Sequence, residues 1–173
     1  TRVLTEDWRL IALDSNVDGS VLQAQYDWLD RLFAEDAKAA ARTPGCLLVM
    51  WHAPLYSSGF HRGSGDKMRP LWQLIDRHGA DLVLSGHEHF YERFDPLDAE
   101  GQSPGDSHAP RQFVVGTGGA RLHGFWKPPY RSKARVLEHG VLQLSLERGS
   151  YSWRFIDVEG RVQDAGEARC RTT

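Results

Sequence analysis

Three short apolar runs in the first half of the chain predict buried strands. The runs are Trp8–Ser15, Cys46–Trp51 and Ala80–Gly86, and their apolar stretches show no alternation with polar residues. Such runs are typical of strands that are covered on both faces. Between them, in 20–42 and 67–79, apolar residues recur at the three-and-four spacing of a helix with one apolar face. The first half is therefore predicted to alternate strand and helix.

The order strand, loop, helix, strand over 46–86 predicts a βαβ unit. Its two strands should be parallel and its crossover right-handed. In such units, ligands bind at the carboxyl ends of the strands. His52 follows the first of these strands, and His87 and His89 follow the second. We therefore expect the three histidines to be neighbours in space.

The pattern changes after Pro96–Pro110, a stretch rich in glycine, proline, serine and aspartate that predicts an exposed loop. Beyond it, short runs rich in valine, leucine, phenylalanine and tryptophan alternate with turn residues. This pattern predicts antiparallel strands over 111–119 and 139–162, with hairpin turns at ERGS and VEGR. The whole chain is predicted to be one α/β domain with mixed sheets.

Composition and charge narrow the possible function classes. The 173 residues carry a formal net charge of -2, which gives no reason to expect binding to nucleic acid or to an anionic membrane. The longest apolar run is far shorter than the roughly 20 residues of a transmembrane helix. Recognition is therefore expected in a local pocket. The chain starts in patterned sequence, without an initiator methionine or signal peptide, so we expect it to be a portion of a longer protein.

His87 and His89 are separated by one residue and follow a glycine. In an extended segment the two side chains would point to the same side, with Glu88 opposite. Neutral imidazole binds zinc, iron and related metals, and His52 would supply a third nitrogen. Two such histidines alone are weak evidence for a metal site, and surface or core positions explain them better. The addition of His52 at a matching strand end favours a metal site.

These motifs resemble a known family. WHAPLYSSGFH followed by GHEHFYERF is similar to the C-terminal half of the calcineurin-like metallophosphoesterases, specifically of their purple acid phosphatase-like branch. FVVGTGGARLHGF and DAGEARC also resemble secreted bacterial members of this branch. The resemblance implies that 1–173 is the C-terminal portion of a single catalytic domain, without its N-terminal half. The implied fold is the corresponding half of a four-layer α/β/β/α sandwich.

The resemblance implies a metal-binding role for the three histidines. The family's two-metal centre uses a histidine after a buried strand and a Gly-His-x-His motif, which match His52, His87 and His89. His52 and His87 would bind one ion and His89 the other. The ions would be divalent or trivalent Fe, Zn or Mn, among which histidine ligands do not discriminate.

The loop after His52 holds candidate substrate residues. His61 lies where this branch carries a substrate-facing histidine, and it would bind phosphate or protonate the leaving oxygen, since both of its protonation states are accessible. Arg62 would contact an anionic substrate, and Tyr56 would line the pocket. The alternatives are a solvated histidine, an exposed arginine and a tyrosine packed beneath the loop.

The carboxylates of the family's metal centre come from motifs that precede this region. The chain contains no Gly-Asn-His. Asp106-Ser107-His108 spells the family's Asp-x-His, but it lies in the expected loop after the histidine pair, and we interpret it as a chance match. The isolated chain is therefore expected to be a poor catalyst that needs the N-terminal half of the domain.

Cys46 and Cys170 are the two cysteines of the chain. A disulfide across so long a loop would stabilise the fold by about 4 to 5 kcal/mol and would need an oxidising compartment. Spacing alone leaves two unrelated thiols equally open. The resemblance to secreted members favours the bridge, and it implies a secreted or periplasmic location.

The predicted activity of the parent protein is hydrolysis of small phosphate esters, preferably monoesters, with phosphodiesters left open because no residue that would shape the pocket decides between them. The resemblance implies attack by metal-bound hydroxide. The rival interpretation is a non-catalytic metal-binding or structural module that retains the fold. Structural roles are expected for Asp14 and His78, whereas His123 has no identifiable partner in the sequence. Tyr91 and Arg93 either brace the metal ligands or serve core packing and a surface ion pair.

Overall fold

The computed structural model describes residues 1–38, 45–60, 65–104, 109–128 and 130–171. The helical elements are α1 (Gly19–Lys38), the 3-10 helix η1 (Gly65–Met68) and α2 (Arg69–Arg77). The strands are β1 (Arg2–Val3), β2 (Trp8–Ala12), β3 (Cys46–Met50), β4 (Leu82–Ser85), β5 (Tyr91–Pro96), β6 (Arg111–Val115), β7 (Ser132–Val136), β8 (Gly140–Glu147), β9 (Ser150–Asp157) and β10 (Val162–Arg169). The three apolar runs of the first half thus form β2, β3 and β4, as predicted.

A seven-stranded mixed sheet has the order β1-β2-β3-β4-β6-β5-β7. The predicted βαβ unit is confirmed, since β3 and β4 are parallel, with Leu48 opposite Leu82. Strand β6 corrects one prediction: it is antiparallel to β5 but parallel to β4, with Leu82 opposite Arg111. The pattern of β6 gave no sign of this, because a buried run fits either direction. The carboxyl ends of four parallel strands therefore meet at one edge of the sheet, those of β2, β3, β4 and β6.

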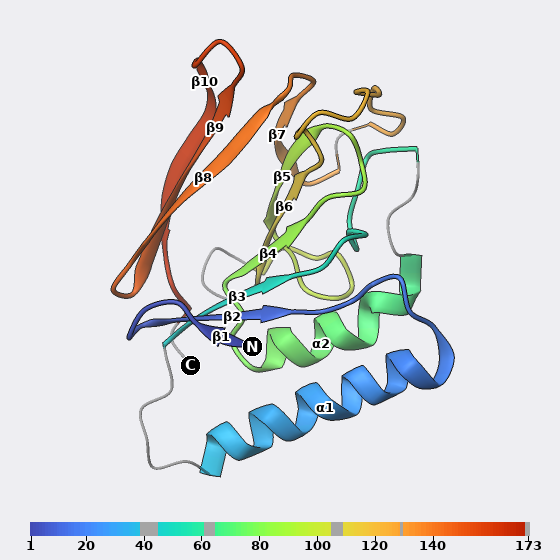
Figure 1. The fold of residues 1–173 in the computed structure, drawn as a ribbon, viewed down its shortest axis with the longest axis vertical. Coiled ribbons are helices and arrows are strands. Elements are labelled where there is room, and N and C mark those ends of the chain that lie inside the picture. Colours follow the sequence, from blue (N-terminus) through green and yellow to red (C-terminus); the bar gives the residue numbers. More distant parts are fainter. Residues whose placement is uncertain (39–44, 61–64, 105–108, 129, 172–173) are drawn as a thin grey trace.

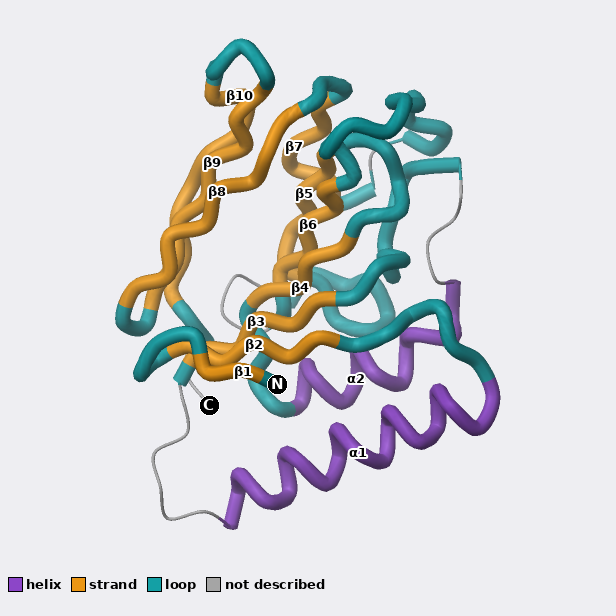
Figure 2. Tube along the Cα trace, viewed as in Figure 1, coloured by secondary structure: helices purple, strands orange, loops and turns teal. Residues whose placement is uncertain are grey.

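Both helices cover one face of this sheet, and a three-stranded sheet covers the other (Figures 1 and 2). Side chains alternate between the two faces, as the geometry of a strand requires. On β3, Leu47 and Val49 face the helices, where they share a core with Leu29 and Trp72. Leu48 faces the other sheet, whose inner face contributes the side chains Tyr151, Trp153 and Phe155. The described layers are α/β/β, which matches the expected α/β fold.

The second sheet is an antiparallel meander in the order β10-β9-β8. Its turns lie at the predicted ERGS and VEGR segments, where Gly149 and Gly160 have φ values of 69° and 80°. Within the described ranges, β8 pairs with no strand other than β9, so beyond the hydrogen bonds of Gly140 with Thr117 its other edge is open. Along β8, Leu142, Leu144 and Leu146 pack toward the core between the sheets.

Tyr91 and Arg93 join the two sheets. The Tyr91 hydroxyl donates to Asp164 Oδ2 at 2.6 Å, and Arg93 donates to both oxygens of Asp164 at 2.8 and 2.9 Å. The Trp153 indole N–H donates to the same carboxylate. Of the two roles considered for Tyr91 and Arg93, the structure therefore supports core packing and an ion pair, which is buried here rather than exposed.

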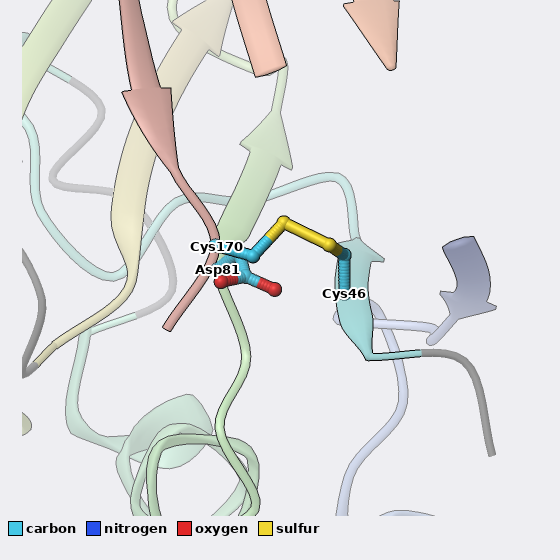
Figure 3. Close-up of side chains that lie close together, drawn as sticks. All are labelled: Cys46, Asp81 and Cys170. Carbon is cyan, nitrogen blue, oxygen red and sulfur yellow. A yellow bond between two sulfur atoms is a disulfide. The ribbon is translucent and has the colours of Figure 1, made fainter. Parts of the chain in front are cut away.

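A disulfide joins Cys46 on β3 to Cys170, which follows β10 (Figure 3). This confirms the predicted bridge. Asp81 lies beside it, with its carboxylate accepting the backbone N–H of Leu47 at 2.7 Å and that of Arg171. The bridge and Asp81 thus fix the end of the chain to the amino-terminal edge of the central strands.

Candidate metal centre

His52 and Gly86 are neighbours because the ladder between β3 and β4 continues past both strands. Trp51 donates its backbone N–H to the Leu84 carbonyl at 3.1 Å, and Gly86 donates to the His52 carbonyl at 2.9 Å. The two histidine motifs therefore meet at the carboxyl edge of the sheet, as the predicted βαβ unit requires. His52 is exposed there, whereas His87 and His89 are half-buried.

The chain turns sharply at His87. The Glu88 N–H donates to the Gly86 carbonyl at 2.8 Å, and His87 between them has a φ of 67°. These features define a γ-turn with a left-handed residue at its centre, a conformation that is uncommon for a residue with a side chain. The expectation of an extended Gly-His-x-His segment is therefore wrong. Strained backbone of this kind is concentrated at functional sites.

The turn directs the His87 ring toward His52. The Nδ1 atom of His87 lies 3.2 Å from the Nε2 atom of His52, and the ring planes are inclined by 79°. Without a metal, these two nitrogens are within hydrogen-bonding distance. Two nitrogen ligands at about 2.05 Å from a tetrahedral zinc ion would be separated by about 3.3 Å. The pair thus has a spacing suited to one shared metal ion.

His89 lies apart from this pair and has different neighbours. Its Nδ1 atom lies 2.9 Å from the Arg121 carbonyl oxygen, and its ring centroid is 4.9 Å from that of His123. A carbonyl only accepts, so Nδ1 of His89 carries a proton, and in the neutral ring Nε2 then keeps its lone pair. This is the arrangement that backbone carbonyls commonly impose on metal-binding histidines.

Among the described residues, one group places three potential ligand atoms within 4.8 Å of one another: Cys46, Asp81 and Cys170. Figure 3 shows that the two sulfur atoms are bonded to each other, and thiolates are what a metal would need. This group is a structural bridge rather than a metal site. The three histidines form no such cluster in the described part of the chain, so binding of His89 to a separate ion remains the prediction.

Of the three predicted substrate residues, the structure describes only Tyr56. His61 and Arg62 lie outside the described residues, as does the Asp106-Ser107-His108 stretch. Tyr56 donates its hydroxyl to the Asp98 carbonyl and packs edge-on against Trp72, with 5.2 Å between the ring centroids. These contacts fit the alternative of a tyrosine packed beneath the loop, and a role of Tyr56 in lining the substrate pocket stays a prediction.

His123 and Glu88 are candidate residues that the sequence motifs did not identify. His123 accepts the backbone N–H of His89 through Nε2 at 3.0 Å. The Glu88 carboxylate is buried, has no hydrogen-bond partner among the described residues and lies 3.7 Å from Nε2 of His123. His123 follows the histidine pair by a long stretch of chain, so no local spacing could connect them. By contrast, His78 is structural as expected, stacked on Phe33 with 4.2 Å between the ring centroids.

A cavity of about 610 Å³ adjoins His52. Its lining includes His52 and Gly86 at the strand ends, Thr117 after β6, and Val141 and Leu142 on β8. The cavity therefore lies between the carboxyl edge of the large sheet and the open edge of the small one. Most of its exposed wall is apolar.

Neither helix in the described part of the chain has the length and apolar character needed to cross a membrane. The longest apolar run, Cys46–Trp51, forms strand β3 and the residue that follows it.

Comparisons with known proteins identify the family. Residues 6–91 match the profile of the family described as Calcineurin-like phosphoesterase. Purple acid phosphatase 22 of Arabidopsis thaliana is 32% identical over 152 residues, which cover 83% of this chain and 34% of that protein. Fe(3+)-Zn(2+) purple acid phosphatase 12 of the same plant is 29% identical over 147 residues, covering 75% of this chain and 30% of that protein.

A solved structure shares the fold. A structure of purple acid phosphatase PPD1 from yellow lupin (Lupinus luteus) seeds superposes with a TM-score of 0.74 at 19% identity, covering 96% of this chain and 32% of that one. The chain thus spans about a third of the length of these relatives. From its sequence matches, we conclude that the chain belongs to the calcineurin-like phosphoesterase family, in its purple acid phosphatase-like branch.

Proposed function

We propose that this chain forms part of the active site of a metal-dependent hydrolase of small phosphate esters, with monoesters as the preferred substrates. The observation that carries the proposal is the 3.2 Å approach of His52 Nε2 and His87 Nδ1 at the carboxyl edge of the sheet. Membership of a phosphoesterase family supports the reaction class.

In this proposal His52 and His87 hold one metal ion and His89 holds the other. The nitrogens of His52 and His87 suit such an ion in spacing, and imidazole suits Fe, Zn and Mn alike. One Arabidopsis relative carries Fe(3+) and Zn(2+) in its name, which supports this choice of metals. When bound, ions of this kind polarise a phosphoryl oxygen and make water acidic enough to supply a nucleophile.

The substrate would be held by residues of the loop after β3. His61 is proposed to bind the phosphate or protonate the leaving oxygen, and Arg62 to contact its negative charge. The Tyr56 hydroxyl is bound to Asp98, so a substrate contact from Tyr56 would come from another part of its side chain. Side chains of this type orient the ester and complete the proton transfer.

We propose that the remaining ligands are carboxylates from a portion of the same domain that precedes this chain. The cavity beside His52 and the open edge of β8 offer a place where that portion would pack. The fraction of the relatives' length that the chain covers supports this view. In this proposal the intact protein is the enzyme, and the isolated chain is inactive.

The proposed location is outside the cytoplasm, in a secreted or periplasmic protein. The disulfide between Cys46 and Cys170 supports it, because such bonds persist in oxidising compartments.

The proposal is tested by metal analysis of the intact protein together with hydrolysis of a chromogenic phosphate monoester. His52→Ala and His89→Ala should each reduce bound metal and lower kcat/KM by at least about 100-fold, because loss of a ligand should cost no less than the largest effect of losing a ligand's hydrogen-bond partner. His78→Gln serves as the matched control, because His78 stacks on Phe33 and is assigned a structural role.

Activity that survives both alanine substitutions would contradict the assignment of His52 and His89 as metal ligands. A protein that binds no metal and hydrolyses no phosphate ester would be a non-catalytic module with the same fold, which is the rival interpretation.

A further inference from the structure

The segment 121–123 lies directly against His89 and contacts it at three atoms. The His89 backbone N–H donates to Nε2 of His123 at 3.0 Å, and the His123 N–H donates to the His89 carbonyl at 3.4 Å. The His89 side chain donates from Nδ1 to the Arg121 carbonyl at 2.9 Å. His123 thus forms hydrogen bonds with the backbone of His89, and the Arg121 carbonyl forms one with its ring.

These contacts determine which nitrogens carry protons. A backbone N–H only donates, so Nε2 of His123 accepts and is unprotonated in this arrangement. The Phe90 ring stands edge-on to the His123 ring at 5.7 Å between centroids. The side chain of His123 is therefore held by the ring contact with Phe90 as well as by the hydrogen bond at Nε2.

We propose that His123 is a positioning residue for the metal ligand His89, an inference that rests on the proposed function. By accepting the His89 N–H, His123 keeps the segment 121–123 beside the turn. The Arg121 carbonyl is then placed to bind Nδ1–H of His89, which leaves Nε2 to face a metal ion. His123 acts on the ligand through these contacts and touches neither the metal nor the substrate.

An acceptor at the position of Nε2 is the feature on which this role depends. A leucine would fill much of the space but would leave the His89 N–H without its acceptor. A glutamine can place its Oε1 close to the position of Nε2, whereas an asparagine is too short to do so. His123→Gln is therefore the conservative variant, and His123→Asn and His123→Leu remove the contact.

The test uses the intact protein labelled with ¹⁵N-histidine and titrated with Zn²⁺. Long-range ¹H–¹⁵N spectra report the tautomer of His89 in the absence of metal, and the shift of its Nε2 resonance reports zinc binding at that residue. His89 should be Nδ1-protonated in the wild type and in His123→Gln. In His123→Asn and His123→Leu it should become a tautomer mixture, with zinc affinity at His89 reduced about 10- to 100-fold.

Wild-type tautomer and zinc affinity in His123→Asn would overturn the proposal, and equal loss in all three variants would assign His123 to packing alone. If His123→Leu does not fold, the glutamine and asparagine pair decides between these results. A wild type that binds no zinc would contradict the proposed function. The tautomer spectra would then still decide whether His123 positions the ring.

Discussion

Arg93 on β5 and Asp164 on β10 form a buried ion pair that joins the two sheets. The guanidinium donates to both carboxylate oxygens, and the two side chains are 12% and 9% exposed. Removing one member of such a pair leaves a buried charge without its counterpart. The pair therefore makes docking of the small sheet sensitive to a single substitution.

Asp164→Ala is expected to lower the free energy of unfolding by about 3 to 5 kcal/mol, because Arg93 loses its buried partner. Urea denaturation followed by tryptophan fluorescence measures this change. Adding Arg93→Met to Asp164→Ala should recover part of the loss by removing the unpaired charge. Glu159→Ala is the control: it removes the ion pair of Glu159 with Arg161, whose side chains are 56% and 61% exposed. It should change the free energy of unfolding by at most about 0.5 kcal/mol.

Gly116 supports the turn that carries the histidine pair, and this predicts a second effect on stability. A Cβ atom at Gly116 would lie 2.0 Å from the Glu88 carbonyl oxygen and 3.3 Å from the His89 Cα atom. Because backbone cannot move aside as a side chain does, Gly116→Ala should destabilise the fold by about 1 to 3 kcal/mol.

Gly118→Ala is the matched control, since a Cβ there meets nothing within 4 Å. Thermal unfolding of the two variants should separate them clearly, with Gly118→Ala close to the wild type. Equal melting temperatures would show that the backbone does not pack closely at Gly116.

The meeting of His52 with Gly86 could be predicted from the sequence, and the reason is local. Uniform apolar runs ending at Trp51 and at Gly86 mark parallel strands, and parallel strands bring their carboxyl ends together. The disulfide could be expected only by resemblance, because two cysteines far apart in sequence give no geometry of their own.

The direction of the histidine side chains could not be predicted in this way. The positive φ of His87 accompanies a turn that packs against Gly116, a residue on another strand end. The contact of His123 with His89 likewise depends on where a long loop returns. Local periodicity carries no information about such contacts, so the assumption of an extended segment failed at His87 and nothing in the sequence pointed to His123.

The carboxyl group of Asp81 predicts a pH dependence of stability. Burial raises its pKa from 3.8 to about 6, and the N–H groups of Arg171 and Leu47 only partly oppose this rise. A raised pKa in the folded state means that folding favours the protonated form. The resulting stabilisation is complete below about pH 4 and is lost as the pH rises through about 6.

Relative to Asp81→Asn, which cannot titrate, the wild type should therefore gain stability as the pH falls from 7 to 4. The gain should be at most about 3 kcal/mol, since each pKa unit corresponds to about 1.4 kcal/mol. Urea denaturation at four pH values measures the difference between the two proteins. Parallel pH dependences would contradict the assignment to Asp81.

Reduction of the disulfide between Cys46 and Cys170 should weaken the whole fold. The bridge joins residues 124 positions apart, so opening it frees a long loop in the unfolded chain, with an expected loss of about 4 to 5 kcal/mol in the chain-entropy model. Denaturation with and without dithiothreitol measures this loss. The Cys46→Ala/Cys170→Ala protein is the control: it should resemble the reduced wild type and should not respond to dithiothreitol. An unchanged unfolding midpoint after verified reduction would show that Asp81 and the packing between the sheets hold the carboxyl-terminal strand without the bond.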